Sequence, residues 1–315
     1  MSAADPFHHV RDASYFEVPR FVVNLVGEGY FQLPKIFGLQ ITKYMVLQVV
    51  AGLLALLIFR GLASHIRGGK PARGRWWNFW EMLALGVRDQ IVRPAIGVPH
   101  DDHHDEGHAP HSVGTTHQHH YEHPPAVLAG AHAAAVDVTH PADKFLPFIW
   151  SIFFYILFCN LLGAIPALGS PTASIATTGV LAVAVLVVVV MAGVQKSGWT
   201  GYLKSIAPTM DLPGPMGMVI KPLVWVIEFI GLLIKHFVLA VRLYANMLAG
   251  HTVIGVILGF IAVAANEGVV WYLVTPASIF GQVAIGMLEL FVAFLQAYVF
   301  AFLASLFIGA SVNPH

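Results

Sequence analysis

The sequence has few charged residues, and this scarcity narrows the class of protein. Lys and Arg number 17, Asp and Glu also number 17, and together they make up 11% of the 315 residues. A net charge of zero offers no basic surface to nucleic acid, so we expect no nucleic-acid partner. Because 57% of the residues are apolar, the composition predicts an integral membrane protein with several spans rather than a globular enzyme.

Cysteine is almost absent as well, since Cys159 is the only one in the chain. A single cysteine excludes an internal disulfide framework, and its place in an apolar run indicates a packing role. The sequence has no GxxxxGK[ST] motif, so we expect no nucleotide site and no cofactor. The first residues show no basic stretch followed by an apolar core, which argues against a cleaved signal peptide.

Residues 41–59 form the first apolar run that is long enough to cross a membrane. The basic residues that follow it are Arg60, Arg67, Lys70, Arg73 and Arg75. By the positive-inside rule this cluster marks the cytoplasmic side, so the N-terminal segment, residues 1–40, is expected to be extracytoplasmic.

Residues 75–93 have a different pattern, in which tryptophans and apolar residues recur at helical spacing opposite Arg88, Asp89 and Arg93. Such an amphipathic helix suits the membrane interface, and we expect it to lie there. The first span and this interfacial helix together occupy residues 41–99.

Histidine is concentrated in one stretch, because 11 of the 17 histidines lie between residues 100 and 140. This polar segment has no periodicity, so we interpret residues 100–143 as a cytoplasmic insert that is disordered. Its spacing does not match a structural zinc site, and we expect weak metal binding at most, or pH sensitivity instead. The candidate metal ligands are His103, His104, His119 and His120.

Residues 144–315 are expected to form a bundle of membrane helices, in four further apolar runs. These runs cover residues 144–168, 178–194, 221–262 and about 279–310, and the last two exceed the ~20 residues that one span needs. Between the last two, residues 264–278 carry Glu267 but no basic residue, and we expect them to form an extracytoplasmic loop. Lysines follow the second of them, which leaves the C-terminus on the cytoplasmic side. The predicted fold class is therefore an all-α integral membrane protein with about five membrane helices and one interfacial amphipathic helix.

Ionisable residues interrupt the long run at 221–262, and Arg242 is the most costly of them. An arginine at membrane depth costs at least ~2.5 kcal/mol and does not shed its proton, so it needs a carboxylate partner or a wet cavity. Glu228, Lys235 and Arg242 follow at seven-residue steps and share one helix face, with Asn246 one turn further on. His251 falls nearly opposite Arg242 on the helix.

The last apolar run carries two strongly polar residues in its middle, Glu289 and Gln296, seven positions apart. A bare carboxylate in hydrocarbon either takes up a proton or pairs with a cation, so the expected partner of Glu289 is His251 or Arg242. A histidine and a glutamate together form a proton relay that works near neutral pH.

These residues resemble those of a known family, subunit a of the rotary F-type ATP synthase. The resemblance rests on RLYANMLAGH at residues 242–251, with Glu289 and Gln296 on the last helix, and it extends from about residue 41 to the C-terminus. The order of elements is also similar: one span, an interfacial helix, two spans and two long helices. The resemblance implies that the last two helices are strongly tilted and wrap along a ring of c subunits.

The resemblance also implies roles for single residues. Arg242 corresponds to the arginine that faces the carboxylates of the c-ring and separates two half-channels, with Asn246 and Gln296 near that contact. Glu228 corresponds to an acidic residue of the cytoplasmic, inner access path. His251 and Glu289 correspond to a pair that lines the outer path. Asn160 matches an asparagine of the second span, whereas Gly163 stands where some members have a carboxylate.

The function implied is a proton-conducting stator that couples ion flow to rotation and ATP synthesis. The implied partners are the c-ring, the subunit b peripheral stalk, the other synthase subunits and membrane lipid. Because no transit peptide is evident, we expect a bacterial inner membrane, although an organelle-encoded protein would have the same features. The alternatives are a secondary transporter with a histidine-rich collecting loop and a structural membrane anchor. A transporter predicts internal repeats with broken helices, which the sequence does not show. A purely structural anchor would not explain the ionisable residues within the apolar runs. The sequence does not decide whether the coupled ion is a proton or sodium.

Overall fold

The computed structural model describes residues 13, 15–17, 30–36, 38–66, 74–97, 140–165, 168–206, 215–265 and 268–313. The predictions for the insert at 100–143, including metal ligands His103, His104, His119 and His120, fall almost wholly outside these residues. The described part of the N-terminal segment contains two short antiparallel hairpins that the sequence did not predict. Their strands are β1 (Tyr15–Glu17) with β2 (Tyr30–Gln32), and β3 (Lys35–Ile36) with β4 (Leu39–Gln40).

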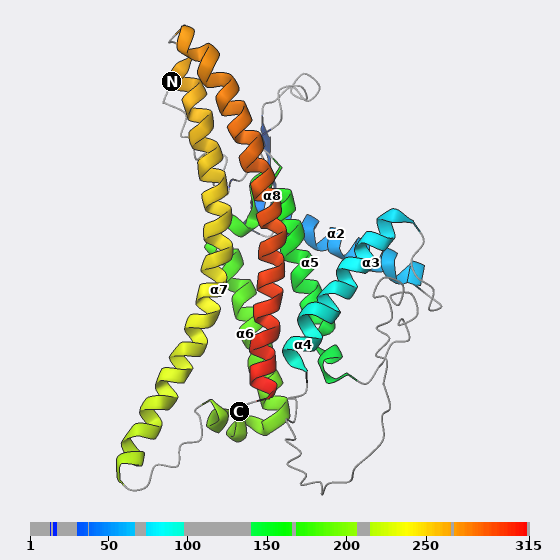
Figure 1. Cartoon of the computed structure of the whole chain (residues 1–315), viewed down its shortest axis with the longest axis vertical. Helices are drawn as coiled ribbons and strands as arrows, with labels where there is room; N and C mark the ends of the chain where they lie inside the picture. The colour runs from blue at the N-terminus through cyan, green and yellow to red at the C-terminus, as the bar shows by residue number, and fades with distance from the viewer. Residues whose placement is uncertain are drawn as a thin grey trace, which may run out of the picture.

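Helices make up nearly all of the rest of the described chain (Figure 1). They are α2 (Lys43–Ile66), α3 (Arg75–Gly86), α4 (Arg93–Ile96), α5 (Leu146–Gly163), α6 (Ile175–Ser205), α7 (Pro215–Ala264) and α8 (Val269–Val312). Shorter helical segments are the π-helix η2 (Val87–Val92) and the 3-10 helices η4 (Pro141–Lys144) and η5 (Pro171–Ala173). Five helices, α2, α5, α6, α7 and α8, are long and apolar enough to cross a membrane. This confirms the all-α membrane fold.

The centre of the core is α5, which packs against α2 on one side and α8 on the other. Its sequence is apolar on every face, as expected for a helix with neighbours all round. Ile149, Ile156 and Leu157 are completely buried, and Phe154 stacks edge-on against Phe59 of α2 with ring centroids 4.9 Å apart. The core of the subunit is therefore built around a helix that is shorter than its neighbours.

The predicted amphipathic helix forms one continuous helical segment through α3, η2 and α4. Its apolar face packs inward, with Trp80, Val87 and Ile91 buried, while Trp76 stays 62% exposed. The indole N–H of Trp150 in α5 donates to the carbonyl oxygen of Ala84 at 2.9 Å. This segment is thus tied to the core along one face and open along the other, as its period predicts.

The two longest helices, α7 and α8, form a hairpin that runs the length of the molecule (Figure 1). The prediction of a loop at residues 264–278 is wrong, because α7 continues to Ala264 and α8 already begins at Val269, so most of this stretch is helical. The residues from 269 onward are apolar enough to continue the span, and Pro276 lies inside the helix without ending it. The turn is instead placed at Gly268, whose φ of 43° suits a residue without a side chain.

Polar contacts join the helix ends near the C-terminus, and we name this group the terminal clasp. It consists of Arg93 with Asp143 (2.9 Å), Lys144 with Gln195 (2.6 Å), Lys196 with Asn313 (2.8 Å) and Asn313 with the carbonyl of Gly97 (3.3 Å). The Arg93 guanidinium holds the pKa of the Asp143 carboxyl below its usual range, mainly through their hydrogen bond. The clasp therefore secures Gly97, shortly before the insert, and Asp143 and Lys144, at its far end, to the helical bundle.

Candidate functional site

The structure brings His251 of α7 and Glu289 of α8 together. Their Nδ1 and Oε1 atoms are 3.1 Å apart, and the two side chains are only 13% and 6% exposed. The imidazole Nδ1 also lies 3.0 Å from the carbonyl oxygen of Met247. Oε1 nevertheless has no hydrogen bond of good geometry to the described residues, so the contact with His251 is one of charge and distance.

Gly250 makes this close approach possible. A Cβ atom built on Gly250 would lie 3.0 Å from Oε1 and 3.2 Å from Cδ of Glu289. The carboxylate therefore rests against the bare backbone of α7, one position before its histidine partner. A side chain at residue 250 would push the carboxylate outward, away from His251.

Arg242 has a contrasting environment, because it is exposed on the surface of α7. No carboxylate among the described residues lies within ion-pair distance of its guanidinium. Glu228 and Lys235 are exposed as well, and their seven-residue spacing places all three charges on one face. Of the two partners expected for Glu289, the structure selects His251 and leaves Arg242 on the open face.

Asn246 and Gln296 are half-buried residues on facing helices, α7 and α8. Asn246 lies one turn beyond Arg242, and Gln296 lies two turns beyond Glu289. The amides of Asn246 and Gln296 therefore lie on the same two helices as His251, Glu289 and Arg242.

Glu228 lines a hollow of about 310 Å³ near the terminal clasp, which we name the Glu228 hollow. Tyr202, Ser205 and Ser311 also line it, together with Lys235. The hydroxyl of Ser311 donates to the carbonyl of Val189 at 2.8 Å, which joins α8 to α6 at its wall. A carboxylate, an ammonium and three hydroxyl groups can hold water, so this hollow provides a polar site at the opposite end of α7 from His251.

Comparison with known proteins places these residues in a family. The family described as ATP synthase A chain matches residues 127–309 of the sequence, which include Arg242, His251 and Glu289. The chain belongs to the ATP synthase A chain family.

Bacterial relatives named ATP synthase subunit a support this assignment over most of the chain. That of Chloroherpeton thalassium is 31% identical over 98% of this chain and 76% of its own length. That of Myxococcus xanthus is 34% identical over 87% and 73%, and that of Anaeromyxobacter dehalogenans is 41% identical over 98% and 70%. The prediction of a multi-pass, proton-translocating subunit of the F-type ATP synthase is therefore confirmed, and a secondary transporter is not favoured.

In this member of the ATP synthase A chain family, Asn160 is completely buried in a hydrogen-bonded cluster that the sequence did not predict. Its Oδ1 accepts from the hydroxyl of Thr172 at 2.8 Å, and its Nδ2 lies 3.4 Å from the carbonyl oxygen of Ala293 in α8. The hydroxyls of Ser170 and Thr172 are 2.6 Å apart. The cluster joins α5 to α8 one turn beyond Glu289. Asn160 therefore helps to position the part of α8 that carries Glu289.

Gly163 is required by the same cluster. A Cβ atom there would lie 2.3 Å from Cβ of Ser170, so no larger residue fits without moving the turn. The small residues of GSPTA at 169–173 were the available signal, because a turn of Gly, Pro, Ser and Thr packs closely after a span. Among the described residues, no group of three His, Cys, Asp or Glu side chains is arranged to hold a metal ion.

Proposed function

We propose that α7 presents its charged face to a ring of c subunits, with Arg242 opposite the ring's carboxylates. The observation that carries this proposal is the exposure of Arg242 on α7 without a carboxylate partner in the described residues. A permanent cation in the hydrocarbon region needs a partner, and a second chain is the remaining source. Only 11% of the most apolar stretch of α7 is buried in this chain, which leaves a long surface for that partner.

Two access paths reach the arginine from opposite ends of α7. The outer path passes the buried pair His251 and Glu289, with Asn246 and Gln296 beyond it. The inner path opens at the Glu228 hollow. Glu228 and His251 are 23 residues apart, which corresponds to about 34 Å along a helix. The two paths therefore enter at well-separated depths.

Apolar side chains fill the space between these paths within the subunit. Leu239, Leu243 and Met247 lie on the inward face of α7, and each is no more than 2% exposed. Their packing excludes water from a direct route between Glu228 and His251 along the helix interface. A proton then has to travel by way of the partner ring, which is what couples its flow to rotation.

Arg242 supplies the electrostatic step. Its fixed charge favours the ionised form of a ring carboxylate that passes it, so the proton leaves to the inner path before that point. A fresh proton arrives past His251 and Glu289, and the neutral carboxyl group then enters lipid. The membrane potential drives each charge with ~2.3 kcal/mol per 100 mV.

The orientation we propose follows the basic residues. Residues 1–40 lie outside and the C-terminus lies in the cytoplasm of a bacterial cell, with the chain in the inner membrane. The insert at 100–143 is an accessory on the cytoplasmic side, and this is supported by the contacts of Gly97, Asp143 and Lys144 in the terminal clasp. The subunit b stalk and the remaining synthase subunits complete the assembly.

The test is a substitution of Arg242 in the assembled synthase. Arg242→Ala is expected to abolish ATP-driven acidification of inverted vesicles, because no fixed cation then separates the paths. Val238→Ala, 45% exposed one turn earlier, is the matched control and should pump normally. Normal pumping by Arg242→Ala would refute the proposal.

A further inference from the structure

We infer that the end of α6 and the start of α7 together bind the headgroup of one anionic phospholipid. The site, which we name the lysine patch, consists of Trp199, Leu203 and Lys204 of α6 and Lys221, Trp225 and Phe229 of α7. The inference goes beyond the proposed function, because its ligand is a lipid and its residues are not those of the proton paths. It does not depend on how Arg242 acts.

A kink turns the last part of α6 away from the direction of the span. Gly198 has a φ of 71° and a ψ of 169°, which are not helical values and which suit a residue without a side chain. Figure 1 shows the part of α6 after the kink lying across the end of the bundle, beside the C-terminus. There Tyr202 is 6% exposed, whereas Trp199 and Leu203 are 66% and 44% exposed. This segment therefore has one face on the bundle and one open apolar face, as helices in the membrane interface have.

One hydrogen bond brings the two helix ends together. The indole N–H of Trp225 in α7 donates to the carbonyl oxygen of Leu203 in α6 at 2.8 Å. Lys204 directly follows Leu203, and Lys221 lies one turn before Trp225 on the same face of α7. Both lysines are exposed. Two ammonium groups from different helices therefore flank one contact point.

Both of these lysines have donors to spare. Among the described residues, neither Lys204 nor Lys221 takes part in a hydrogen bond or an ion pair, and the indole N–H of Trp199 has no acceptor. Lys196, on the other side of the kink, differs, because it donates to Asn313 in the terminal clasp at 2.8 Å. Ammonium groups and an indole N–H are donors only, so the ligand that suits them is an acceptor with negative charge, such as a phosphate group.

The face of α7 that carries Lys221 has the same order of chemistry as a phospholipid. Lys221, Trp225 and Phe229 follow at four-residue steps, so their side chains are neighbours along one face. The rings of Trp225 and Phe229 stack, with centroids 5.4 Å apart and planes within 3°. An ammonium is followed by an indole and then by a plain phenyl ring, which matches phosphate, glycerol esters and acyl chain, and tryptophan favours the headgroup level. A free phosphate ion would leave both rings without a partner.

The charge of the patch selects an anionic lipid over a zwitterionic one. A zwitterionic headgroup brings its own ammonium group close to Lys204 and Lys221, whereas an anionic headgroup brings only the phosphate. Basic residues near a membrane surface each strengthen the attraction to anionic lipid. The nearest acidic residue along α7 is Glu228, seven positions from Lys221, and it lines the Glu228 hollow instead.

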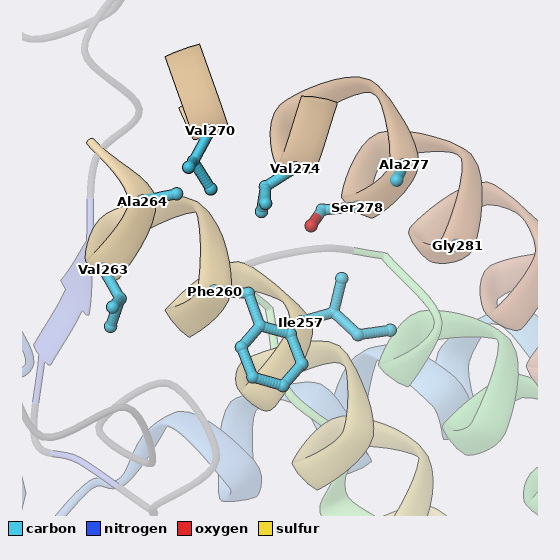
Figure 2. Close-up of a pocket in the computed structure, with 9 residues that line it drawn as sticks. All are labelled: Ile257, Phe260, Val263, Ala264, Val270, Val274, Ala277, Ser278 and Gly281. Carbon is cyan, nitrogen blue, oxygen red and sulfur yellow. The ribbon is translucent and has the colours of Figure 1, made fainter. Parts of the chain in front are cut away.

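The opposite end of the α7–α8 hairpin has apolar surface of a different kind. A hollow of about 490 Å³ is lined there by residues between Ile257 and Ala264 of α7 and between Val270 and Gly281 of α8 (Figure 2). Ser278 is the only one of these lining residues with a polar side chain, and none is a lysine or an arginine. That hollow offers nothing that distinguishes one headgroup charge from another. Of the two ends of α7, the lysine patch is therefore the one that can select a lipid by its charge.

The first experiment measures lipid binding by the assembled synthase. The purified complex is titrated in detergent with dioleoyl phosphatidylglycerol or dioleoyl phosphatidylcholine, and lipid bound to this subunit is read by native mass spectrometry. Lys204→Gln and Lys221→Gln are each expected to weaken binding of phosphatidylglycerol about fivefold, and the double variant about 25-fold. Lys35→Gln, at an exposed lysine of the N-terminal segment, is the matched control and should bind as wild type does. Lys204→Arg should also bind as wild type, since it keeps the charge.

Three outcomes of this titration would overturn the inference. The first is equal affinity of the wild-type complex for the two lipids, and the second is unchanged affinity for phosphatidylglycerol in the double variant. The third is displacement of phosphatidylglycerol by an equal concentration of inorganic phosphate, which would show a site for a small anion. Binding needs no turnover, so the result is independent of the one obtained with Arg242→Ala.

The second experiment locates the lipid. Phosphatidylglycerol with a diazirine near the start of one acyl chain is photolysed with the assembled synthase, and the crosslinked peptides are identified by mass. Crosslinks are expected within residues 199–230, and the Lys204→Gln, Lys221→Gln double variant should reduce them at least about fivefold. Trp225→Phe keeps an aromatic ring but loses the bond to Leu203, so it should lose crosslinks to α6 and keep those to α7.

The position of the crosslinks also decides against plainer explanations. Crosslinks concentrated at residues 60–75, the basic stretch after the first span, would show general attraction to basic residues and would overturn the site. An absence of crosslinks within residues 199–230 of the assembled synthase would show that another subunit covers the patch, and it would overturn the site as well.

Discussion

Helices α5 and α7 are both strongly apolar, yet the structure treats them in opposite ways. In α5, 61% of the most apolar stretch is buried within the chain, whereas in α7 the value is 11%. The buried helix has one strongly polar residue near its C-terminal end, Asn160, and both polar atoms of that side chain are hydrogen-bonded. The open helix carries three exposed charges, Glu228, Lys235 and Arg242, of which the first two line the Glu228 hollow. Apolar composition alone therefore does not distinguish a core helix from an interface helix.

The difference indicates where each helix obtains its partners. In α5 the polar side chain is hydrogen-bonded and the aromatic rings are packed within the chain, so this helix needs no partner from another protein. Its role is to hold the helical bundle together. Unpaired charges in a membrane helix are tolerated when another molecule meets them. The four predictions below test this division of labour, beginning with the largest change in free energy.

The first prediction concerns packing. Phe154→Ala should lower the free energy of unfolding by about 3–5 kcal/mol, because it removes a ring that is 1% exposed and contacts Phe59 and Trp80. Phe237→Ala, on the open side of α7 at 66% exposure, should change it by less than about 0.5 kcal/mol. Thermal unfolding of the detergent-solubilised subunit gives both values. Equal losses would remove the contrast between the two helices.

The second prediction concerns the buried pair. His251→Ala or Glu289→Ala alone is expected to slow ATP-driven proton pumping by about 100-fold, as for the loss of one group in a proton relay. Exchanging the two, His251→Glu with Glu289→His, should recover at least about tenfold of that loss, because the pair is regenerated across the same 3.1 Å contact. An exchange variant as inactive as the single changes would show that the residues act separately.

The third prediction uses two glycines of the same helix. Gly250→Ala should slow pumping by about tenfold, since the new methyl group meets the Glu289 carboxylate at 3.0 Å and displaces it from His251. Gly259→Ala has nothing within 4 Å of its Cβ and serves as the control. Both changes alter helix propensity equally, so similar rates for the two variants would exclude a role for Gly250 in seating the carboxylate.

The fourth prediction is the smallest and tests the terminal clasp. Arg93 lowers the pKa of Asp143, so the carboxylate adds stability above its unfolded pKa of about 3.9, and this stability is lost as pH falls through the lower folded value. Asp143→Asn should therefore cost up to about 1 kcal/mol at pH 7 and nothing at a pH below the folded value. Asp89→Asn, at a carboxylate that is 48% exposed, should cost less. A cost for Asp143→Asn that persists in strong acid would argue against the ion pair as its source.

Much of the fold follows from the sequence, because long apolar runs in a membrane protein admit few structures. Runs beginning near residues 41, 144 and 221 predicted α2, α5 and α7 with small errors at their ends. The 264–278 region was misjudged, since Pro276 and the nearby polar residues resemble a loop, whereas a proline is tolerated inside a membrane helix. The short hairpins near residues 15–40 have two or three residues per strand and offer no readable period.

For the candidate site, the sequence predicted residue types better than their partners. Seven-residue spacing was enough to place Glu228, Lys235 and Arg242 on one face, because spacing along one helix determines that face. Whether Glu289 meets His251 or Arg242 depends on the rotation of α8 against α7, which no local pattern encodes. The Ser170 and Thr172 contacts to Asn160 were missed for the same reason, since they arise from a turn that folds back between helices.

The C-terminal half of α8 is fastened to the bundle at several heights, through Ala293 to Asn160, through Ser311 to Val189 and through Asn313, just past its end, to Gly97 and Lys196. In the proposed complex, a ring that pushes sideways on α7 would deliver an equal and opposite load to this chain, and the chain would have to transmit that load. Since α8 packs directly against α7, these contacts of α8 are the ones that would transmit the load to the rest of the bundle. Under that proposal, loosening these contacts would let α7 and α8 shift under load, so that protons would still flow while less of their energy would be coupled to ATP synthesis.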